Sequence, residues 1–259
     1  MIVGMPFLLE HSSVQEACVL CRALKLDFVE LNANFPICQT ERLNMDELRR
    51  LKDACGVDFT IHVEEAFDPF AFQAGIREAW LASFRSTVEL AKELEIPVVT
   101  MHLPHGVYMT LPGERSYLYA RYPGEYNAAL REFRNMCEVW LQGSNVRIAI
   151  ENTDGFMPHE QKAVAYLLES PAFGLTLDVG HLHGAGYGDL PLYEAHWDKL
   201  VHMHVHDAQG RKNHLALGDG EIDMPVWFDK AEQCGASVVL EVKETKALHQ
   251  SVQWLRERR

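Results

Sequence analysis

Histidines and carboxylates recur where short apolar segments of the chain end. The segments FTIH, VVTMH, RIAIE, LTLD, HMH and VVLE end at His62, His102, Glu151, Asp178, His204 and Glu241. Successive side chains of a strand point to opposite faces, so the last residue of each segment shares a face with every second residue before it. Imidazole and carboxylate groups that converge are the usual ligands of divalent metal ions. The pattern therefore predicts a metal site built on strand ends.

Four of these residues, Glu151, Asp178, His204 and Glu241, end consecutive segments in the second half of the chain. One such carboxylate would more often be a salt-bridge or helix-cap partner, but four groups on neighbouring strands favour a ligand set. Three carboxylates and one imidazole suit a hard or borderline ion. We expect a single divalent ion there: manganese, cobalt, magnesium or zinc.

The HMHVH segment places His202, His204 and His206 on one face at different depths. His202 lies deepest and is expected to be a hydrogen-bonded core residue, whereas His204 is the predicted ligand. His206, at the rim, is predicted to bind substrate. His181 follows Asp178 by three residues and is expected at the same rim.

A second group of histidines, His62, His102 and His214, would add nitrogen ligands on the opposite side of the mouth. Nitrogen ligands suit zinc, so these residues predict a second, zinc-type site. Histidines near a carbohydrate can instead donate hydrogen bonds to its hydroxyl groups, and His62 is therefore also a candidate substrate-binding residue.

Strands that alternate with helices must position these groups. Strands are predicted near residues 2–5, 27–31, 57–62, 97–102, 146–151, 174–178, 200–206 and 237–241, with amphipathic helical patterns between them. Counting back by two from the strand ends predicts an inner lining of Thr60, Thr100, Ala149, Thr176, His202 and Val239. An open doubly wound sheet is disfavoured because no glycine-rich turn follows the first strand. The fold class is α/β, a single (β/α)₈ barrel with parallel strands, over one domain of residues 1–259.

Composition limits the classes of partner. The chain has 47% hydrophobic and 24% charged residues and no apolar run long enough to span a membrane. The N-terminal MIVGMPFLLEH lacks a basic leader, so we expect a cytoplasmic protein. A net charge of −13 disfavours nucleic acid as a partner. Six scattered cysteines, including the Cys18 and Cys21 pair within a predicted helix, are expected to be reduced and mostly buried.

Two connections, 103–124 and 206–223, are longer than is usual for a strand-helix unit. The first is rich in tyrosine, and the segment EEAFDPFAFQ at 64–73 is also aromatic. Loops that follow barrel strands build the active site, so these segments are candidate lids. A contact in a homo-oligomer would explain them equally well.

The chain resembles the xylose-isomerase-like barrel superfamily, which includes sugar isomerases, ketose 3-epimerases, inosose dehydratases and zinc-dependent apurinic endonucleases. The resemblance rests on IAIENTDG around Glu151, TLDVGH around Asp178, HMHVHDAQG around His204, NHLALGDGEID around His214 and VVLEVK around Glu241. These segments cover most of the second half of the chain in register.

The resemblance to the epimerases implies that Glu151, Asp178, His204 and Glu241 hold the metal, with Glu151 and Glu241 also as the acid-base pair. His181 would position a substrate oxygen, and Arg211 is a further candidate for substrate binding. The substrate would be a sugar, polyol or sugar derivative that undergoes enediolate-type proton transfer. Epimerases of this type have a further glutamate where this chain has Met157.

The resemblance to the endonucleases implies a different outcome. Eight of nine trinuclear zinc ligands would be present: His62, His102, Glu151, Asp178, His181, His204, His214 and Glu241. The ninth, an aspartate, is replaced by Lys212, and no basic stretch interleaved with aromatic residues would grip a duplex. We therefore expect a metal-dependent sugar isomerase or epimerase, with a zinc-dependent phosphodiesterase or a non-catalytic ligand-binding barrel as the alternatives.

Overall fold

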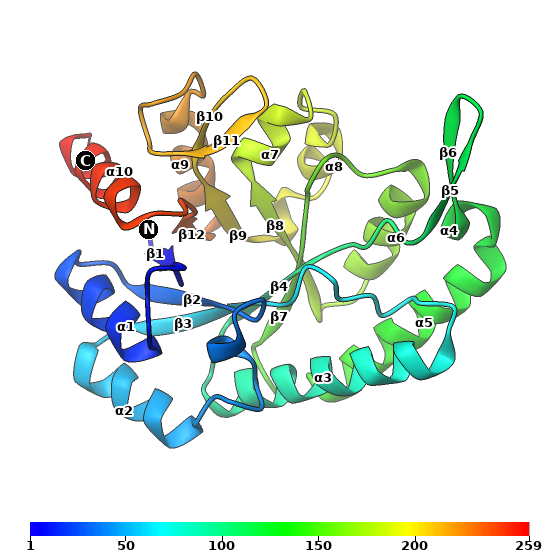
Figure 1. The fold of residues 1–259 in the computed structure, drawn as a ribbon, viewed down its shortest axis with the longest axis horizontal. Helices are drawn as coiled ribbons and strands as arrows, with labels where there is room; N and C mark the ends of the chain where they lie inside the picture. The colour runs from blue at the N-terminus through cyan, green and yellow to red at the C-terminus, as the bar shows by residue number, and fades with distance from the viewer. Residues whose placement is uncertain (259) are drawn as a thin grey trace.

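The computed structural model describes residues 1–258, which form a closed barrel of parallel strands in the order β1–β12–β9–β8–β7–β4–β3–β2 (Figure 1). The barrel strands are β1 (Val3–Pro6), β2 (Phe28–Asn32), β3 (Asp58–His62), β4 (Val98–His102), β7 (Arg147–Glu151), β8 (Phe173–Asp178), β9 (Leu200–Val205) and β12 (Ser237–Leu240). Each overlaps a predicted strand, so the predicted (β/α)₈ barrel is confirmed. The domain bounds 1–259 stay a prediction, because residue 259 lies outside the described part.

Helices connect and cover the strands. They are α1 (Val14–Ala23), α2 (Met45–Cys55), α3 (Ala74–Glu93), α4 (Leu118–Arg121), α5 (Pro123–Trp140), α6 (Pro158–Leu168), α7 (Val179–Gly184), α8 (Leu190–Glu194), α9 (Met224–Cys234) and α10 (Thr245–Glu257), with 3₁₀ turns η1 (Pro36–Cys38) and η2 (Trp197–Lys199). Side-chain oxygens of Ser13 and Asn44 cap α1 and α2. Over residues 1–258, no helix is both long and apolar enough to cross a membrane.

Polar side chains line the inside of the barrel as predicted. Thr60, Thr100, Thr176 and His202 are all buried. The hydroxyl groups of Thr100 and Thr176 lie 3.1 Å apart, although β4 and β8 are not neighbours in the barrel. A contact between strands that are not adjacent requires both side chains to point inward. The alternation counted from the strand ends is therefore correct.

The six cysteines are free thiols, and four of them are buried. Cys18 and Cys21 lie inside α1, facing the core. Burial raises the pKa of the Cys18 thiol to about 12, so this thiol stays protonated at neutral pH. The expectation that most of the thiols are buried is confirmed.

The two long connections fold into hairpins that the sequence analysis did not anticipate. Strands β5 (Tyr108–Leu111) and β6 (Glu114–Tyr117) pair antiparallel and project from the barrel (Figure 1). Strands β10 (Asp207–Gln209) and β11 (Lys212–Leu215) pair beyond the carboxyl end of β9. The second hairpin places His214 beside the barrel mouth.

The loop after β11 is held by one buried carboxylate, that of Asp207. It accepts hydrogen bonds from the backbone N–H groups of Ala208, Gly218, Gly220 and Ile222, at 2.9 to 3.1 Å. A Cβ at Gly220 would lie only 2.3 Å from the Ala208 oxygen, so the loop needs glycine at this position. Asp207 thereby fixes the LGDGEI segment against the barrel.

Candidate metal centre

The carboxyl ends of β7, β8, β9 and β12 bring together Glu151, Asp178, His204 and Glu241, here called the four-residue site. One ligand atom from each lies within 4.8 Å of the others. The Nδ1 atom of His204 is 2.8 Å from Glu151 Oε1 and 3.3 Å from Glu241 Oε2. The geometry thus brings these four residues together as predicted, with the histidine in contact with both glutamates.

The donor set of the four-residue site fits a divalent cation. Three carboxylates share a small volume, with Glu151 and Asp178 buried, and Glu241 Oε2 is a buried oxygen that no donor satisfies. Burial alone would raise the pKa of Glu151, but the charges of His204 and His102 hold it well below its usual range. A cation between these crowded ionised carboxylates would satisfy the oxygen that has no donor. The buried histidine and carboxylate groups fit a divalent metal ion.

His62 and His102 lie beside Glu151 on the β3 and β4 side of the site. Their Nε2 atoms are 3.0 and 3.3 Å from Glu151 Oε2. His62 donates its Nδ1–H to the carbonyl oxygen of Val63 at 2.7 Å, so its Nε2 atom is the one that faces the site. The structure therefore pairs these two histidines with a carboxylate that they can share with the four-residue site.

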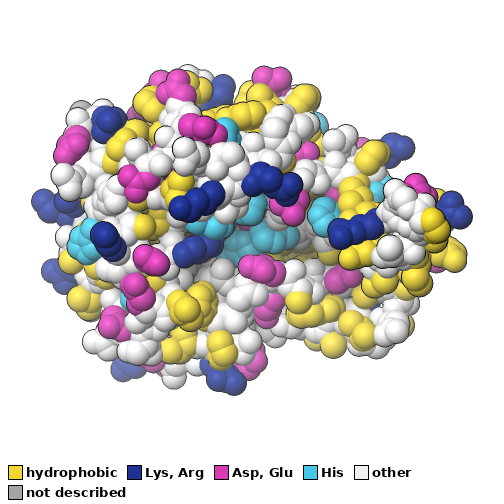
Figure 2. Space-filling model, turned by 45° about the horizontal axis from the view of Figure 1, so that its top comes forward, with side chains coloured by type: hydrophobic (Ala, Val, Ile, Leu, Met, Phe, Trp, Pro, Cys, Tyr) yellow, Lys and Arg dark blue, Asp and Glu magenta, His cyan; other side chains and the backbone are white. Residues whose placement is uncertain are grey.

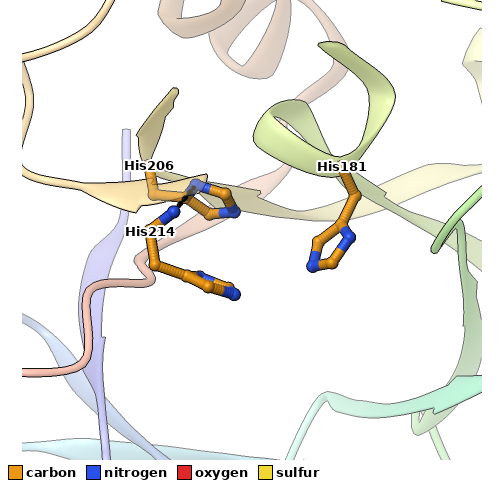
Figure 3. A group of neighbouring side chains, drawn as sticks. All are labelled: His181, His206 and His214. Carbon is orange, nitrogen blue, oxygen red and sulfur yellow. Dashed lines mark hydrogen bonds between the residues drawn. The ribbon is translucent and has the colours of Figure 1, made fainter. Parts of the chain in front are cut away.

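His214 lies elsewhere, in a group with His181 and His206 that we call the three-histidine cluster. Their ring nitrogens come within 4.8 Å of one another, and Figure 3 shows the His181 ring across from the other two. His214 donates its Nδ1–H to the Glu241 carbonyl oxygen at 3.1 Å, which leaves Nε2 with a free lone pair. Burial lowers the pKa of His214 to about 4, so the ring is neutral.

His206 is completely buried, and both of its nitrogens are engaged. Nδ1 accepts from the backbone N–H of His214 at 2.8 Å, so the neutral ring carries its proton on Nε2, 3.2 Å from the Asp178 carboxylate. This contact orients a predicted metal ligand. Gly180 makes room for it, because a Cβ there would lie 1.9 Å from His206 Cε1. Substrate binding by His206 stays a prediction.

Three basic residues of the loops near the barrel mouth differ in whether they contact the four-residue site. Arg211 is exposed in the turn between β10 and β11, and Lys212 is exposed on β11. Figure 2 shows histidine side chains gathered at the centre of this face with charged side chains around them. The Nζ atom of Lys243 lies 2.7 Å from Glu241 Oε1. The sequence analysis missed Lys243, although its spacing of two from Glu241 in an extended segment was a signal for the same face.

Glu30 is a second residue that the sequence analysis missed. It lies on β2 inside the barrel, 3% exposed, with Oε1 3.1 Å from His204 Nε2 and Oε2 3.2 Å from His202 Nε2. The charge of His204 and the hydrogen bond from His202 outweigh burial and lower the pKa of Glu30 far below its usual value. An acidic residue inside the apolar segment FVEL was the available signal.

Comparison with known proteins agrees with the fold. The Xylose isomerase-like TIM barrel family matches residues 18–258, and the chain belongs to this family. An uncharacterized protein of Methanocaldococcus jannaschii, MJ1311, is 24% identical over 222 residues, covering 81% of this chain and 71% of that protein.

Solved structures share the same barrel. A D-tagatose 3-epimerase-like protein superposes with a TM-score of 0.79 at 22% identity, covering 99% of this chain and 96% of its own. The IOLI protein, crystallised with a bound zinc atom, superposes with a TM-score of 0.75 at 15% identity, covering 99% and 96%. At these identities the likeness establishes the fold.

Proposed function

We propose that the protein is a metal-dependent isomerase or epimerase of a sugar, polyol or sugar derivative. The observation that carries the proposal is the placement of two carboxylates, Glu151 and Glu241, at 2.8 and 3.3 Å from the same atom, His204 Nδ1. Two carboxylates at one centre can act as an acid-base pair, one removing a proton from a substrate carbon and the other returning it. The epimerase-like structural neighbour supports the same class of reaction.

The four-residue site would hold the ion. A divalent ion bound there supplies the positive charge that stabilises an enediolate. Glu241 takes the proton α to the substrate carbonyl, and Glu151 serves as the opposite acid. His204 and, to a smaller extent, Lys243, whose Nζ lies 2.7 Å from Glu241 Oε1, lower the pKa of Glu241 and keep this carboxylate ionised. His181 and Arg211 at the rim would bind substrate oxygens. Dehydration of a cyclic polyol begins with the same proton removal.

Exchange of the substrate α-proton with solvent tests the proposal. The probes are D-tagatose, D-allulose, D-fructose and their 6-phosphates, incubated with the manganese-loaded protein in deuterated water and followed by NMR. We expect exchange with at least one sugar, and a loss of more than about 100-fold in Glu241→Gln, as for removal of a general base. Glu244→Gln, in an exposed position three residues away, is the matched control and should keep the wild-type rate.

A second candidate function is phosphodiester cleavage by a zinc cluster, and the three-histidine cluster is the observation that favours it. With His62 and His102 on one side of the four-residue site and His181 and His214 on the other, several ions could share the carboxylates. Mass spectrometric metal counting distinguishes the candidates. About one ion per chain fits the isomerase, whereas two or three zinc ions, with cleavage of abasic DNA, fit the phosphodiesterase.

Binding without turnover is the third alternative. A barrel that binds a ligand would take up a sugar from the same panel and show no proton exchange in any metal form. Isothermal titration with the sugars, run beside the exchange assay, separates this outcome from the enzyme.

A further inference from the structure

Glu30 is a carboxylate held inside the barrel below the four-residue site. Its oxygens are surrounded by the Thr60 hydroxyl at 3.2 Å, His202 Nε2 at 3.2 Å and His204 Nε2 at 3.1 Å. Enclosing a charge in a protein interior is costly, and apolar side chains fill such a layer with equal or greater stability. The barrel does not need this charge in order to close. We therefore ask how the Glu30 carboxylate affects the side chains that surround it.

The two ring nitrogens of His204 face different groups. Nδ1 lies 2.8 Å from Glu151 Oε1 in the four-residue site, whereas Nε2 lies 3.1 Å from Glu30 Oε1. The Nε2 contact is an ion-pair distance whose angle does not make a regular hydrogen bond, and Nε2 is a buried nitrogen without another partner among the described residues. A carboxylate beside Nε2 favours a proton on that nitrogen, which leaves the lone pair of the neutral ring on Nδ1. That lone pair points between Glu151 and Glu241, a direction that is favourable only toward a cation.

Glu30 is itself fixed from the layer below. His202 lies two residues before His204 on β9, and its Nδ1 atom is 2.7 Å from the hydroxyl oxygen of Ser237, its register partner on β12. With Ser237 at Nδ1, His202 presents Nε2–H to Glu30 Oε2. The carboxylate therefore has one oxygen occupied by Thr60 and His202 and the other directed at His204.

We propose that Glu30 is a positioning residue that fixes the ring of His204 and its proton on Nε2, so that Nδ1 is the atom that binds a divalent ion in the four-residue site. This role of Glu30 rests on the proposed function in one respect, because it requires a divalent ion in the four-residue site. Partners of metal-ligating histidines orient the ring and fix its tautomer, and their loss typically weakens metal binding 10- to 100-fold.

Metal affinity of two variants tests the proposal. Manganese and zinc are titrated into chelator-treated protein in competition with a chromophoric chelator. We expect Glu30→Gln to weaken binding by about 10- to 100-fold. Thr60→Val is the matched control: it removes another partner of Glu30 but leaves Oε1 facing His204, so its affinity should stay within about threefold of the wild type. Wild-type affinity in Glu30→Gln, or an equal loss in both variants, would overturn the proposal.

The tautomer of His204 gives a readout that needs no change at Glu30. Long-range proton-nitrogen NMR of the zinc-loaded wild-type protein should show His204 with its proton on Nε2 and the metal on Nδ1, with His204→Gln used to assign the signal. A proton on Nδ1 would overturn the proposal even if Glu30→Gln failed to fold. Wild-type protein that binds neither ion would overturn the metal centre and the proposed function together, whereas normal wild-type binding with an unaffected Glu30→Gln would overturn only the role of Glu30.

Discussion

Two groups of buried and half-buried carboxylates in this protein differ in how completely their oxygens are paired. In the first, near the β5–β6 hairpin, Asp68 accepts from the Tyr119 hydroxyl and the Phe70 N–H, and Glu160 accepts from His105 and the Met157 N–H. Every oxygen of the pair faces a donor. In the second, the four-residue site, Glu241 Oε2 has no donor and three carboxylates crowd one imidazole.

The difference separates structural carboxylates from ligand-binding ones. A buried carboxylate whose oxygens are all satisfied by donors needs nothing further. A group with more acceptors than donors is stabilised further when a cation is added. The Asp68 and Glu160 pairs should therefore matter for folding alone, whereas the four-residue site should respond to metal.

Removing one carboxylate of the four-residue site should have the largest effect. Asp178→Asn is expected to weaken manganese or zinc binding by more than about 100-fold, beyond the loss typical of an outer-shell partner. For the wild type, an ion at 100 times its Kd should raise the free energy of unfolding by about 2.7 kcal/mol. Chemical denaturation with and without the ion measures this gain, which Asp178→Asn should lose and Asp68→Asn should retain. If the ion stabilised Asp178→Asn as much as the wild type, the distinction between structural and ligand-binding carboxylates would be wrong.

Gly180→Ala should damage the same site through its outer shell. The added Cβ would lie 1.9 Å from His206 Cε1, and the buried ring is held on both sides by Asp178 and the His214 N–H. Overpacking of this kind costs about 1 to 3 kcal/mol, and metal affinity should fall with the displaced ring. Gly184→Ala, in the same helix with open space around it, is the control and should not destabilise the protein. Urea unfolding of both variants would show whether the contact with His206 is responsible.

The sequence predicted the barrel and the four-residue site for a physical reason. Glu151, Asp178 and His204 end or nearly end apolar strands, and parallel strands bring their carboxyl ends to one face whatever the details of packing. The same logic failed for His214, which was grouped with His62 and His102. The position of His214 depends on the β10–β11 hairpin. The sequence pattern of residues 206–223 did not predict this hairpin.

Glu30 and Lys243 were missed for different reasons. Glu30 sits at the third position of β2, where an acidic residue interrupts an apolar pattern without ending it. Its partners His202 and His204 are more than 170 residues away, so only closure of the barrel shows that they meet. Lys243 follows the last strand, and only its spacing of two from Glu241 indicated that both side chains could share a face.

Tyr119→Phe should weaken the structural cluster without affecting metal. Burial raises the pKa of Asp68, and the Tyr119 hydroxyl opposes that shift. A folded-state pKa above the unfolded value means that stability is lost as pH rises through it, and removing the hydroxyl should deepen that loss. We expect a cost of about 1.5 kcal/mol at neutral pH, less at pH 4, measured by urea unfolding. An unchanged pH profile would contradict this role, and the metal-induced gain should stay at the wild-type value.

The smallest expected effect concerns the charge on His105. The hydrogen bond to Glu160 raises the pKa of His105 despite partial burial. The pair therefore stabilises the protein fully below the unfolded pKa of about 6.5, and this contribution is lost as the pH rises through the folded-state pKa. His105→Gln should therefore cost about 0.5 kcal/mol at pH 5.5 and nothing at pH 9. His159, 3.9 Å from the same carboxylate, is a matched control of opposite sign, because burial lowers its pKa. His159→Gln should therefore remove a loss of stability that the wild type shows at acid pH. If the stability of the two variants changed with pH in the same way, the opposite effects expected of His105 and His159 would be contradicted.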